Sequence, residues 1–359
     1  NYDGDAYNVA VGYNAGHDIT GGIDNVIIGG LAGDALTGGS YNIAIGKEAL
    51  STEDGHGRNV AIGYRALQDQ DAGANAYNVA VGYDAGANIT TGVQNIIIGG
   101  DAGITMTSAS YSVAIGYNAL GDEITNSHNV AIGDASMSSS EYSAKNVAVG
   151  SNTLQNVTNG TSTDTYNTAV GYNAGMNITS AIRNTLVGGL AGDSLTTGAY
   201  NTALGMFALS TEDAHGYNTA IGYGTLEQQN AGADAYNTAL GYTAGNAIST
   251  GVRNVLLGAN AGDALTTGSY NVAIGYDALS TEDGDGRNVA VGYQALLNQN
   301  AGQAAYNIAI GFYAGQNVTE GVRNVIIGGN AGDAITTGAN NTAIGHEALG
   351  GEDTGSKNT

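Results

Sequence analysis

The 359-residue chain has no Pro, no Cys and no Trp, and it has only two Phe. Without Cys it forms no disulfide, iron–sulfur cluster or zinc–thiolate site. Without Pro it is not a collagen, despite its 59 Gly. Basic side chains are also scarce, since nine Lys and Arg stand against 32 Asp and Glu, a formal net charge of −23. So acidic a surface repels phosphates, and we expect no nucleic-acid partner.

Long apolar runs are missing as well. Stretches such as Val26–Ile28 fall far short of the roughly 20 residues that a membrane-spanning helix needs. We therefore expect no membrane insertion in this segment. The chain begins at Asn1, and Asn358-Thr359 match the start of another repeat, so we expect a fragment of a longer protein. Its length exceeds that of one ordinary compact core, which favours several domains or a repeat protein.

What the sequence does contain is one motif: Asn, two small or aliphatic residues, an aliphatic residue and Gly, first seen as Asn8-Val9-Ala10-Val11-Gly12. It occurs in 20 complete units, and a few of these are longer than the others. We number positions from the Asn. Position 1 is Asn in 19 of the 20 units, Ser112 being the exception, and position 5 is always Gly. Most units begin about 17 residues after the one before, and a fixed period of this size indicates a solenoid.

Local chemistry favours strands over helices. Residues after the Asn alternate with the period of a strand, and β-branched residues are common at positions 2 and 4. A helix would lose about 1 kcal/mol for each Gly relative to Ala. The invariant Gly indicates a conformation or a close approach that excludes Cβ. Buried Asn side chains can hydrogen-bond to their equivalents in adjacent turns. We predict such a ladder at Asn8, Asn25, Asn42 and Asn59.

The resulting fold prediction is an all-β, parallel β-solenoid with turns of about 17 residues. One unit forms one turn, giving about 20 turns in a single continuous solenoid over residues 1–359. The ninth position reads Gly, Gly, Leu, Leu through most of the chain, which defines superrepeats that start at residues 8, 78, 167, 237 and 307. Residues from about 129 to 166 form an irregular insertion. Because the core is thin, we also expect a homotrimer that covers an open sheet face.

The residue before each Asn tests this register independently. Seven of the nine basic residues of the chain lie there, and they mostly alternate with Tyr. Stacked strands would place these side chains about 4.8 Å apart, so an unbroken Arg column would repel itself. Interleaved Tyr residues separate the charges and offer aromatic faces to the guanidinium groups. We predict a ladder of alternating rings and cations at Tyr236, Arg253, Tyr270, Arg287, Tyr306 and Arg323.

The repeat resembles two known families. "NVAIGYRAL" (59–67) and "NVAIGYDAL" (271–279) resemble head repeats of YadA-like trimeric autotransporter adhesins. "YNTAIGYGTL" (217–226) and "AGDALTTGSYNVAIGYDAL" (261–279) resemble repeats of phage tail-fibre proteins more closely. The resemblance implies a left-handed β-roll in a homotrimer, displayed extracellularly on a virion tail fibre or a bacterial cell surface. It also implies attachment to a glycan or protein receptor on a host. The period here exceeds that usual for adhesin heads, which indicates longer loops or a different roll.

Acidic pairs recur in the "STEDG" turns and are the candidates for chemistry. We interpret them as solubilising charge on exposed turns, with calcium binding as the competing interpretation. The pairs are Glu53 and Asp54, Glu212 and Asp213, and Glu282 and Asp283. The Asp of each "AGDAL" or similar turn (Asp34, Asp193, Asp263 and Asp333) adds some weight to calcium. For the five His we expect different repeat positions, no metal-ligand spacing and places on surface turns.

These observations together predict a non-enzymatic fibre or adhesin segment without a cofactor. One alternative is a monomeric solenoid that binds glycan, calcium or ice. Its glycan form would use the Tyr columns. Its ice form would use the Thr that stands at position 2 of six units, although we expect that position to face the core or a neighbour. A second alternative is a polysaccharide-degrading tailspike, for which the irregular region offers Asp134, Glu141 and Asp164.

Overall fold

The computed structural model describes residues 5–158, 163–284, 286–351 and 354–359. They belong to two compact units, Asn1–Ser180 and Ala181–Thr359, and each unit is described by itself. Every regular element in these ranges is a β-strand. The described part of the chain contains no helix that could span a membrane. The predicted all-β class is therefore confirmed.

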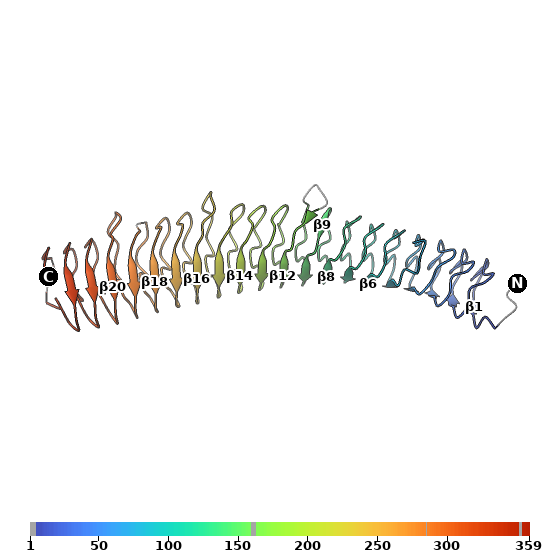
Figure 1. Cartoon of the computed structure of the whole chain (residues 1–359), viewed down its shortest axis with the longest axis horizontal. Helices are drawn as coiled ribbons and strands as arrows, with labels where there is room; N and C mark the ends of the chain where they lie inside the picture. The colour runs from blue at the N-terminus through green and yellow to red at the C-terminus, as the bar shows by residue number, and fades with distance from the viewer. Residues whose placement is uncertain (1–4, 159–162, 285, 352–353) are drawn as a thin grey trace. The chain divides into compact units, whose positions relative to one another are not determined.

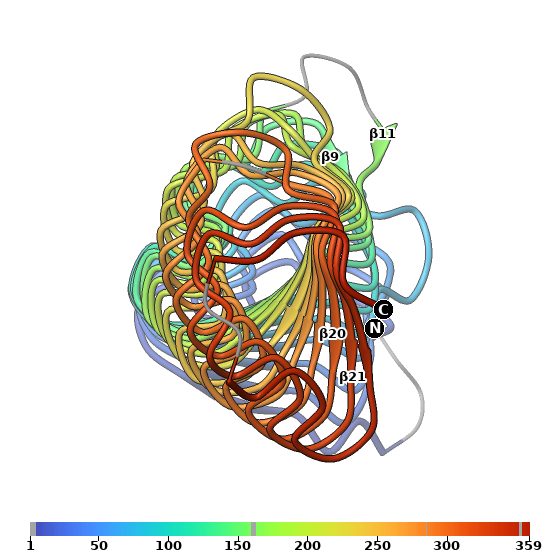
Figure 2. The ribbon, with the colours of Figure 1, turned by 90° about the vertical axis from the view of Figure 1, so that its left-hand side faces the viewer.

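Ten three-residue strands form the main sheet of the first unit. They are β1 (Val9–Val11), β2 (Val26–Ile28), β3 (Ile43–Ile45), β4 (Val60–Ile62), β5 (Val79–Val81), β6 (Ile96–Ile98), β7 (Val113–Ile115), β8 (Val130–Ile132), β10 (Val147–Val149) and β12 (Thr168–Val170). Two short strands, β9 (Ser143–Ala144) and β11 (Thr163–Asp164), pair with each other in the irregular region. Figure 2 shows them at the upper right of the coil, with β11 projecting outside it.

The second unit repeats this arrangement. Its strands are β13 (Thr185–Val187), β14 (Thr202–Leu204), β15 (Thr219–Ile221), β16 (Thr238–Leu240), β17 (Val255–Leu257), β18 (Val272–Ile274), β19 (Val289–Val291), β20 (Ile308–Ile310), β21 (Val325–Ile327) and β22 (Thr342–Ile344). Within each unit the strands lie side by side in chain order (Figure 1). Each unit is thus a stack of turns that each contribute one strand.

Strand pairing is parallel and places equivalent residues on one another. Val9 pairs with Val26 across a unit of the common length, and Val60 pairs with Val79 across a longer one. The longest unit of all separates Val147 from its partner Thr168. The additional residues of each longer repeat therefore lie in its loop, and the strand register is unchanged. This confirms a parallel β-solenoid with one sequence unit per turn in each compact unit.

Side chains alternate across the sheet. Position 3, usually Ala as in Ala44 and Ala61, is buried in every turn except the first, where Ala10 is exposed, whereas positions 2 and 4 point outward. We call the outward-pointing residues at positions 2 and 4 the outer face. The sequence analysis expected Thr at position 2 to face either the core or a neighbour. A place in the core is wrong, because Thr185 and Thr238 are exposed.

The invariant Gly is required by both of the reasons that the sequence suggested. At position 5 the φ angle lies between +125° and +147°, a region that residues with a Cβ avoid. A Cβ on Gly188 would also lie only 2.5 Å from the carbonyl oxygen of Gly205 in the next turn. Consecutive turns therefore touch backbone to backbone at this column.

The Asn ladder forms, and most of its hydrogen bonds join a side chain to the backbone, although the Nδ2 of Asn25 also donates to the Oδ1 of Asn8 at 3.1 Å. The Oδ1 of Asn254 accepts the backbone N–H of Asn271 at 2.9 Å, and its Nδ2 donates to the carbonyl of Gly268 at 2.9 Å. The predicted Asn8, Asn25, Asn42 and Asn59 follow the same pattern of acceptance from the next Asn. Ser112 keeps part of it, because its hydroxyl accepts the N–H of Asn129 at 3.3 Å. A side chain with both an acceptor and a donor explains the preference for Asn.

Core volume explains the four-unit superrepeat. Position 12 also points inward. In units whose position 9 is Gly it is a buried apolar residue, as with Leu36 and Gly33, except that Ile19 in the first turn is only partly buried. A Cβ on Gly33 would lie 2.8 Å from Leu36 Cδ1, so these two positions compete for one space. Where position 12 is a buried Glu or Gln, position 9 is a buried Leu, as with Glu53 and Leu50. Some units thus have their large apolar side chain at position 12 and others have it at position 9, and the core is filled in both kinds of unit.

Gly188→Ala should destabilise the second unit strongly. It places a Cβ at a forbidden φ and against the Gly205 carbonyl, which should lower the free energy of unfolding by on the order of 3 kcal/mol. Gly189→Ala is the matched control, since a Cβ there meets no atom within 4 Å. Urea unfolding followed by circular dichroism measures both. Equal stability of the two variants would contradict the close approach.

Asn254→Leu should cost more stability than Asn254→Ser. Leu leaves the buried N–H of Asn271 and the carbonyl of Gly268 without partners, a loss of about 2–4 kcal/mol. Ser retains an acceptor, as Ser112 does, and should lose about half as much. Measuring the free energy of unfolding of both variants tests this prediction. A Ser variant as unstable as the Leu variant would rule out the acceptor role.

Candidate functional site

The outer face is a continuous apolar surface within each unit. All residues at positions 2 and 4 are Val, Ile, Leu or Thr, and none is charged. Several are exposed to a degree unusual for aliphatic side chains, such as Ile96, Leu204 and Leu240, the last two 46% exposed. Because each turn stacks on the next, these residues form two uncharged columns along the sheet of each unit. The column at position 4 is aliphatic throughout, whereas the column at position 2 includes Thr in six units.

A column of Tyr and basic residues borders this face at the position before each Asn. Arg253 lies between the rings of Tyr236 and Tyr270, with its guanidinium carbon 5.8 and 5.5 Å from their centroids. Arg287 lies in the same way between Tyr270 and Tyr306, at 5.5 Å from each. In addition, the Nη1 of Arg253 donates to the Tyr270 hydroxyl at 2.8 Å. Arg323 occupies the next basic position of this column, with the same left-handed backbone.

The backbone of this column is strained in a way that the sequence did not reveal. Every residue of the column has a positive φ angle, between 47° and 69°, although none of them is Gly. A left-handed conformation costs roughly 1 kcal/mol for a residue with a Cβ. Stacking of rings and cations offsets this cost. It also holds the side chains in fixed positions on the surface.

A second aromatic column follows the invariant Gly on the other side of the outer face. Tyr64 stacks on Tyr83 with ring centroids 5.2 Å apart, and Tyr276 stacks on Tyr293 at 5.4 Å. Most of these rings are exposed, including Tyr83 and Tyr276. Flat, exposed rings beside polar groups can stack on sugars. The aliphatic outer face therefore has an aromatic border on both sides.

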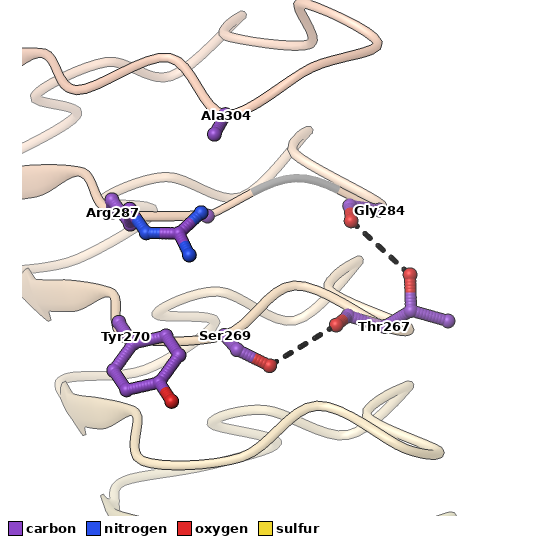
Figure 3. Close-up of a pocket in the computed structure, with 7 residues that line it drawn as sticks. Thr267, Ser269, Tyr270, Gly284, Arg287 and Ala304 are labelled. Carbon is purple, nitrogen blue, oxygen red and sulfur yellow. Dashed lines mark hydrogen bonds between the residues drawn. The ribbon is translucent and has the colours of Figure 1, made fainter.

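A pocket opens beside the first column, across three successive turns of the second unit. It has a volume of about 370 Å³ and includes Tyr270, Arg287, Ser269 and Thr267 (Figure 3). Thr267 Oγ1 donates to the carbonyl of Gly284 at 3.1 Å, which fixes one wall. The combination of a ring, a guanidinium and hydroxyl groups suits a polar ligand such as a sugar.

The acidic turns differ from the prediction of exposed charge. Glu53, Glu212 and Glu282 are fully buried, as is Glu123 in the corresponding turn of the second superrepeat. Only the neighbouring Asp residues, Asp54, Asp213 and Asp283, are exposed. The interpretation of the Glu residues as solubilising charge is therefore wrong. They occupy position 12, the inward position that is apolar in many other units, and the sequence motif alone gave no sign of it.

One Glu oxygen in each of three turns caps the backbone that follows. The Oε1 of Glu53 accepts the N–H of His56 at 2.9 Å, Glu123 accepts the N–H of Asn126 at 2.9 Å, and Glu212 accepts the N–H of His215 at 3.0 Å. Burial raises the pKa of Glu53 and Glu212 above the ordinary carboxyl range. Burial raises the pKa of Glu123 to about 8, although the N–H of Asn126 opposes the shift. These carboxyl groups thus lie in a poorly solvated corner of the core.

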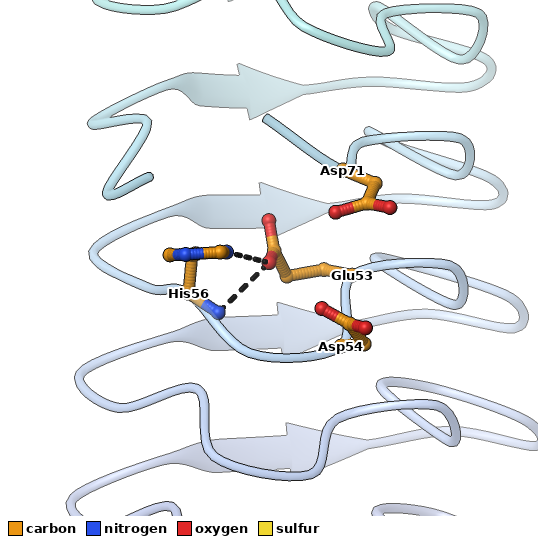
Figure 4. A group of neighbouring side chains, drawn as sticks. All are labelled: Glu53, Asp54, His56 and Asp71. Carbon is orange, nitrogen blue, oxygen red and sulfur yellow. Dashed lines mark hydrogen bonds and ion pairs between the residues drawn. The ribbon is translucent and has the colours of Figure 1, made fainter. Parts of the chain in front are cut away.

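The turns also bring His side chains to two of the buried Glu residues. The Nδ1 of His56 lies 3.6 Å from Glu53 Oε1, and the Nδ1 of His215 lies 3.3 Å from Glu212 Oε1. The expectation that the His residues share no repeat position is wrong, because both stand three residues after the Glu. Asp54 and Asp71 complete the first group (Figure 4), and Asp213 belongs to the second. In each group one potential ligand atom per residue lies within 4.8 Å of the others.

The remaining acidic candidates form no such group among the residues that the structure describes. Residue 285, which follows Glu282 and Asp283 at the His position, lies outside the described residues. Within the described ranges, none of the "AGDAL" carboxylates (Asp34, Asp193, Asp263 and Asp333) belongs to a group that could hold a metal ion.

The three carboxylates considered for a tailspike have different surroundings. Asp134 and Glu141 are exposed on different segments of the described chain. Asp164 forms an ion pair with Lys145, whose Nζ lies 2.6 Å from Asp164 Oδ2. That hydrogen bond lowers the pKa of Asp164, which makes it unsuited to act as a general acid.

Glu123→Gln should remove a pH dependence of stability. Because the pKa of Glu123 is about 8 in the folded state and near 4.5 when unfolded, the folded state keeps its proton as the unfolded state loses it. Its contribution to stability is full below pH 4.5 and is lost as the pH rises to about 8. At pH 8 the Gln variant should be more stable than the parent by on the order of 3 kcal/mol, and at pH 4.5 nearly equal.

Denaturant unfolding at the two pH values measures this difference. Asp122→Asn is the control, since Asp122 is the exposed neighbour and should leave the pH dependence unchanged. If Glu123→Gln leaves the difference between the stabilities at the two pH values unaltered, Glu123 is ionised in the folded protein.

No protein-family model matches the chain, and no curated protein matches it. The strand register, the inward Ala and the stacked columns are therefore the basis for its classification. On this basis the chain is a β-solenoid repeat protein.

Proposed function

We propose that this chain is a non-enzymatic segment of an extracellular attachment fibre, of the tail-fibre or trimeric-adhesin kind. The single observation that carries the proposal is the outer face, a charge-free surface of aliphatic residues and some Thr on an otherwise acidic molecule. Each ten-stranded unit presents it over about 48 Å, at about 4.8 Å per strand. Continuous apolar surfaces of this extent mark an interface.

The occupant that we propose for this face is a second and a third copy of the same chain. A net charge of −23 would repel other copies over most of the surface. None of the 32 acidic residues stands at position 2 or 4, so the outer face is where like chains can meet without repulsion. The homotrimer, in preference to a dimer, rests on the resemblance of the repeat to adhesin heads and tail fibres.

Attachment is proposed for the surfaces that the trimer leaves exposed. The Tyr and Arg column and the pocket at Tyr270 and Arg287 offer aromatic faces, a cation and hydroxyl groups to a host glycan or protein receptor. Repetition every few turns would give many weak contacts along a fibre, which strengthens attachment through avidity. The fibre would belong to a virion or to a bacterial surface.

A monomeric solenoid that binds a ligand is the second candidate. It is favoured by one specific observation: Thr stands at position 2 in β13, β14, β15 and β16, all on the outer face. A regular, flat array of Thr could order water, as an ice-binding surface does. This function and trimer formation would use the same surface, so they exclude each other.

The mass of the 359-residue chain in solution distinguishes the two candidates. Sedimentation should give three chains for the parent protein and one chain for the double variant Leu204→Glu/Leu240→Glu, which places two charges on the outer face. The matched control is Gln228→Glu/Gln303→Glu, which adds the same charge at exposed loop positions and should remain a trimer. A folded parent protein that sediments as a monomer would refute the proposed trimer, and ice and glycan binding would then be tested on that monomer.

A further inference from the structure

We propose that the turns at Glu53–His56 and Glu212–His215 each bind a divalent transition-metal ion of the zinc class. The first site combines Glu53, Asp54, His56 and Asp71, and the second combines Glu212, Asp213 and His215. Each site lies within one compact unit. The inference is independent of the proposed function, because it requires neither a trimer nor a receptor.

The distance between the His and Glu side chains supports a shared ion. The Nδ1 of His56 lies 3.6 Å from Glu53 Oε1, and the corresponding distance at His215 is 3.3 Å. Neither Nδ1 takes part in a hydrogen bond. Two ligands of one tetrahedral zinc ion, each about 2.0–2.1 Å from the metal, lie about 3.3 Å apart. The His and Glu atoms are thus spaced as ligands of one ion.

A second, independent observation is the presence of buried polar atoms without partners. Glu53 and Glu212 are fully buried, yet the Oε2 of each has no hydrogen-bond partner. Such an orphaned oxygen is costly in a folded protein. Figure 4 shows the Glu53 carboxylate between the imidazole of His56 and the carboxylates of Asp54 and Asp71. A cation in the middle of this group would provide the missing partner.

The donor set selects the class of metal. Calcium and magnesium prefer oxygen ligands alone, and calcium takes six to eight of them. Here each site contains an imidazole nitrogen together with a few carboxylates, which suits zinc and its neighbours among the transition metals. The calcium alternative raised by the acidic pairs is therefore less suited to these two turns than a zinc-class ion is.

The chain contains a natural reference for the same turn without the imidazole. Glu123 is buried at the equivalent position and accepts the N–H of Asn126, which stands where the two sites have His. The turn thus forms without a His, so the His residues at 56 and 215 are not needed for its backbone. Their presence beside a buried carboxylate calls for another role, and a metal ligand is one.

The two sites should differ in affinity. Asp71 reaches the first site from the following turn, where its N–H donates to the carbonyl of Thr90. At the corresponding place in the second unit stands Asn230, whose N–H donates to the carbonyl of Ser249. A neutral amide is a poorer ligand for the ion than a carboxylate. The first site therefore has one more anionic ligand and would also tie two successive turns together.

Titration with Co²⁺ tests the proposal on the full 359-residue chain. Bound Co²⁺ with tetrahedral nitrogen and oxygen ligands has strong visible absorption, and Zn²⁺ added afterwards should displace it. We expect two ions per chain, the second bound at least tenfold more weakly. The single variants His56→Asn and His215→Asn should each bind one ion, and the double variant none. These substitutions copy Asn126, so circular dichroism should show an unchanged fold.

The control variant is His346→Asn, which changes an exposed His whose nearest carboxylate is the exposed Glu347. It should still bind two ions. Binding of two ions by the double His variant would overturn the proposal, as would the absence of Co²⁺ absorption in the parent protein at a tenfold excess of metal. Displacement of Co²⁺ by an equal concentration of Ca²⁺ would overturn the assignment of the metal class. An increase of the melting temperature with Zn²⁺ in the parent, absent from the double variant, would provide a readout independent of the spectrum.

Discussion

The constraint on which this structure depends is that each residue lies directly on its own equivalent in the next turn. Parallel pairing with a constant register makes every position of the repeat a column, spaced at about 4.8 Å. A residue type is acceptable only if it tolerates its own neighbours. Gly at position 5 allows the backbones to touch, and Asn at position 1 gives each turn an acceptor for the next N–H. Both columns are nearly invariant for that reason.

Charged residues satisfy this constraint because uncharged residues separate them along each column. Arg253 and Arg287 are separated by Tyr270, so each guanidinium faces rings and not another cation. Buried Glu obeys the same rule inside the core. Glu53 is followed in its column by Gln70, whose Nε2 donates to the carbonyl of Thr90 and whose Oε1 accepts from Asn78. An uncharged side chain next to each buried carboxyl, Gln in three turns and Ser140 after Glu123, avoids two adjacent charges in a poorly solvated region.

The same columns divide the molecule into surfaces with different chemistry. The outer face carries no charge, the aromatic columns border it, and the acidic residues stand on the loops and corners. Function would follow this division: association through the apolar face, contact with a ligand through the aromatic border, and ion binding at the corner formed by the Glu and His residues. Left-handed backbone at Tyr270 and Arg287 shows that the fold accepts local strain to present that border.

Much of the fold could be predicted from the sequence, because a period of about 17 residues with one strand motif allows few structures. The period, the exclusion of helix and the columns of Gly, Asn and Tyr with Arg follow from residue identity and spacing alone. The candidate site could not be predicted to the same extent. The sequence does not say which side of a three-residue strand faces inward, so the core remained one of two places for Thr at position 2. It also does not say that position 12 points into the core, so Glu53 resembled an ordinary surface carboxylate.

The path of the chain between strands decided which strand side faces the core and that position 12 points inward. Gly and other residues with positive φ bend each turn so that position 12 enters the core while the adjacent Asp remains outside. The same bend brings His56 to Glu53, and the longer loop of the following turn brings Asp71 to both. Sequence determined what repeats and therefore what stacks, because stacking depends only on period. Tertiary structure decided which side chains are buried and which meet across turns, because that depends on backbone direction at each bend.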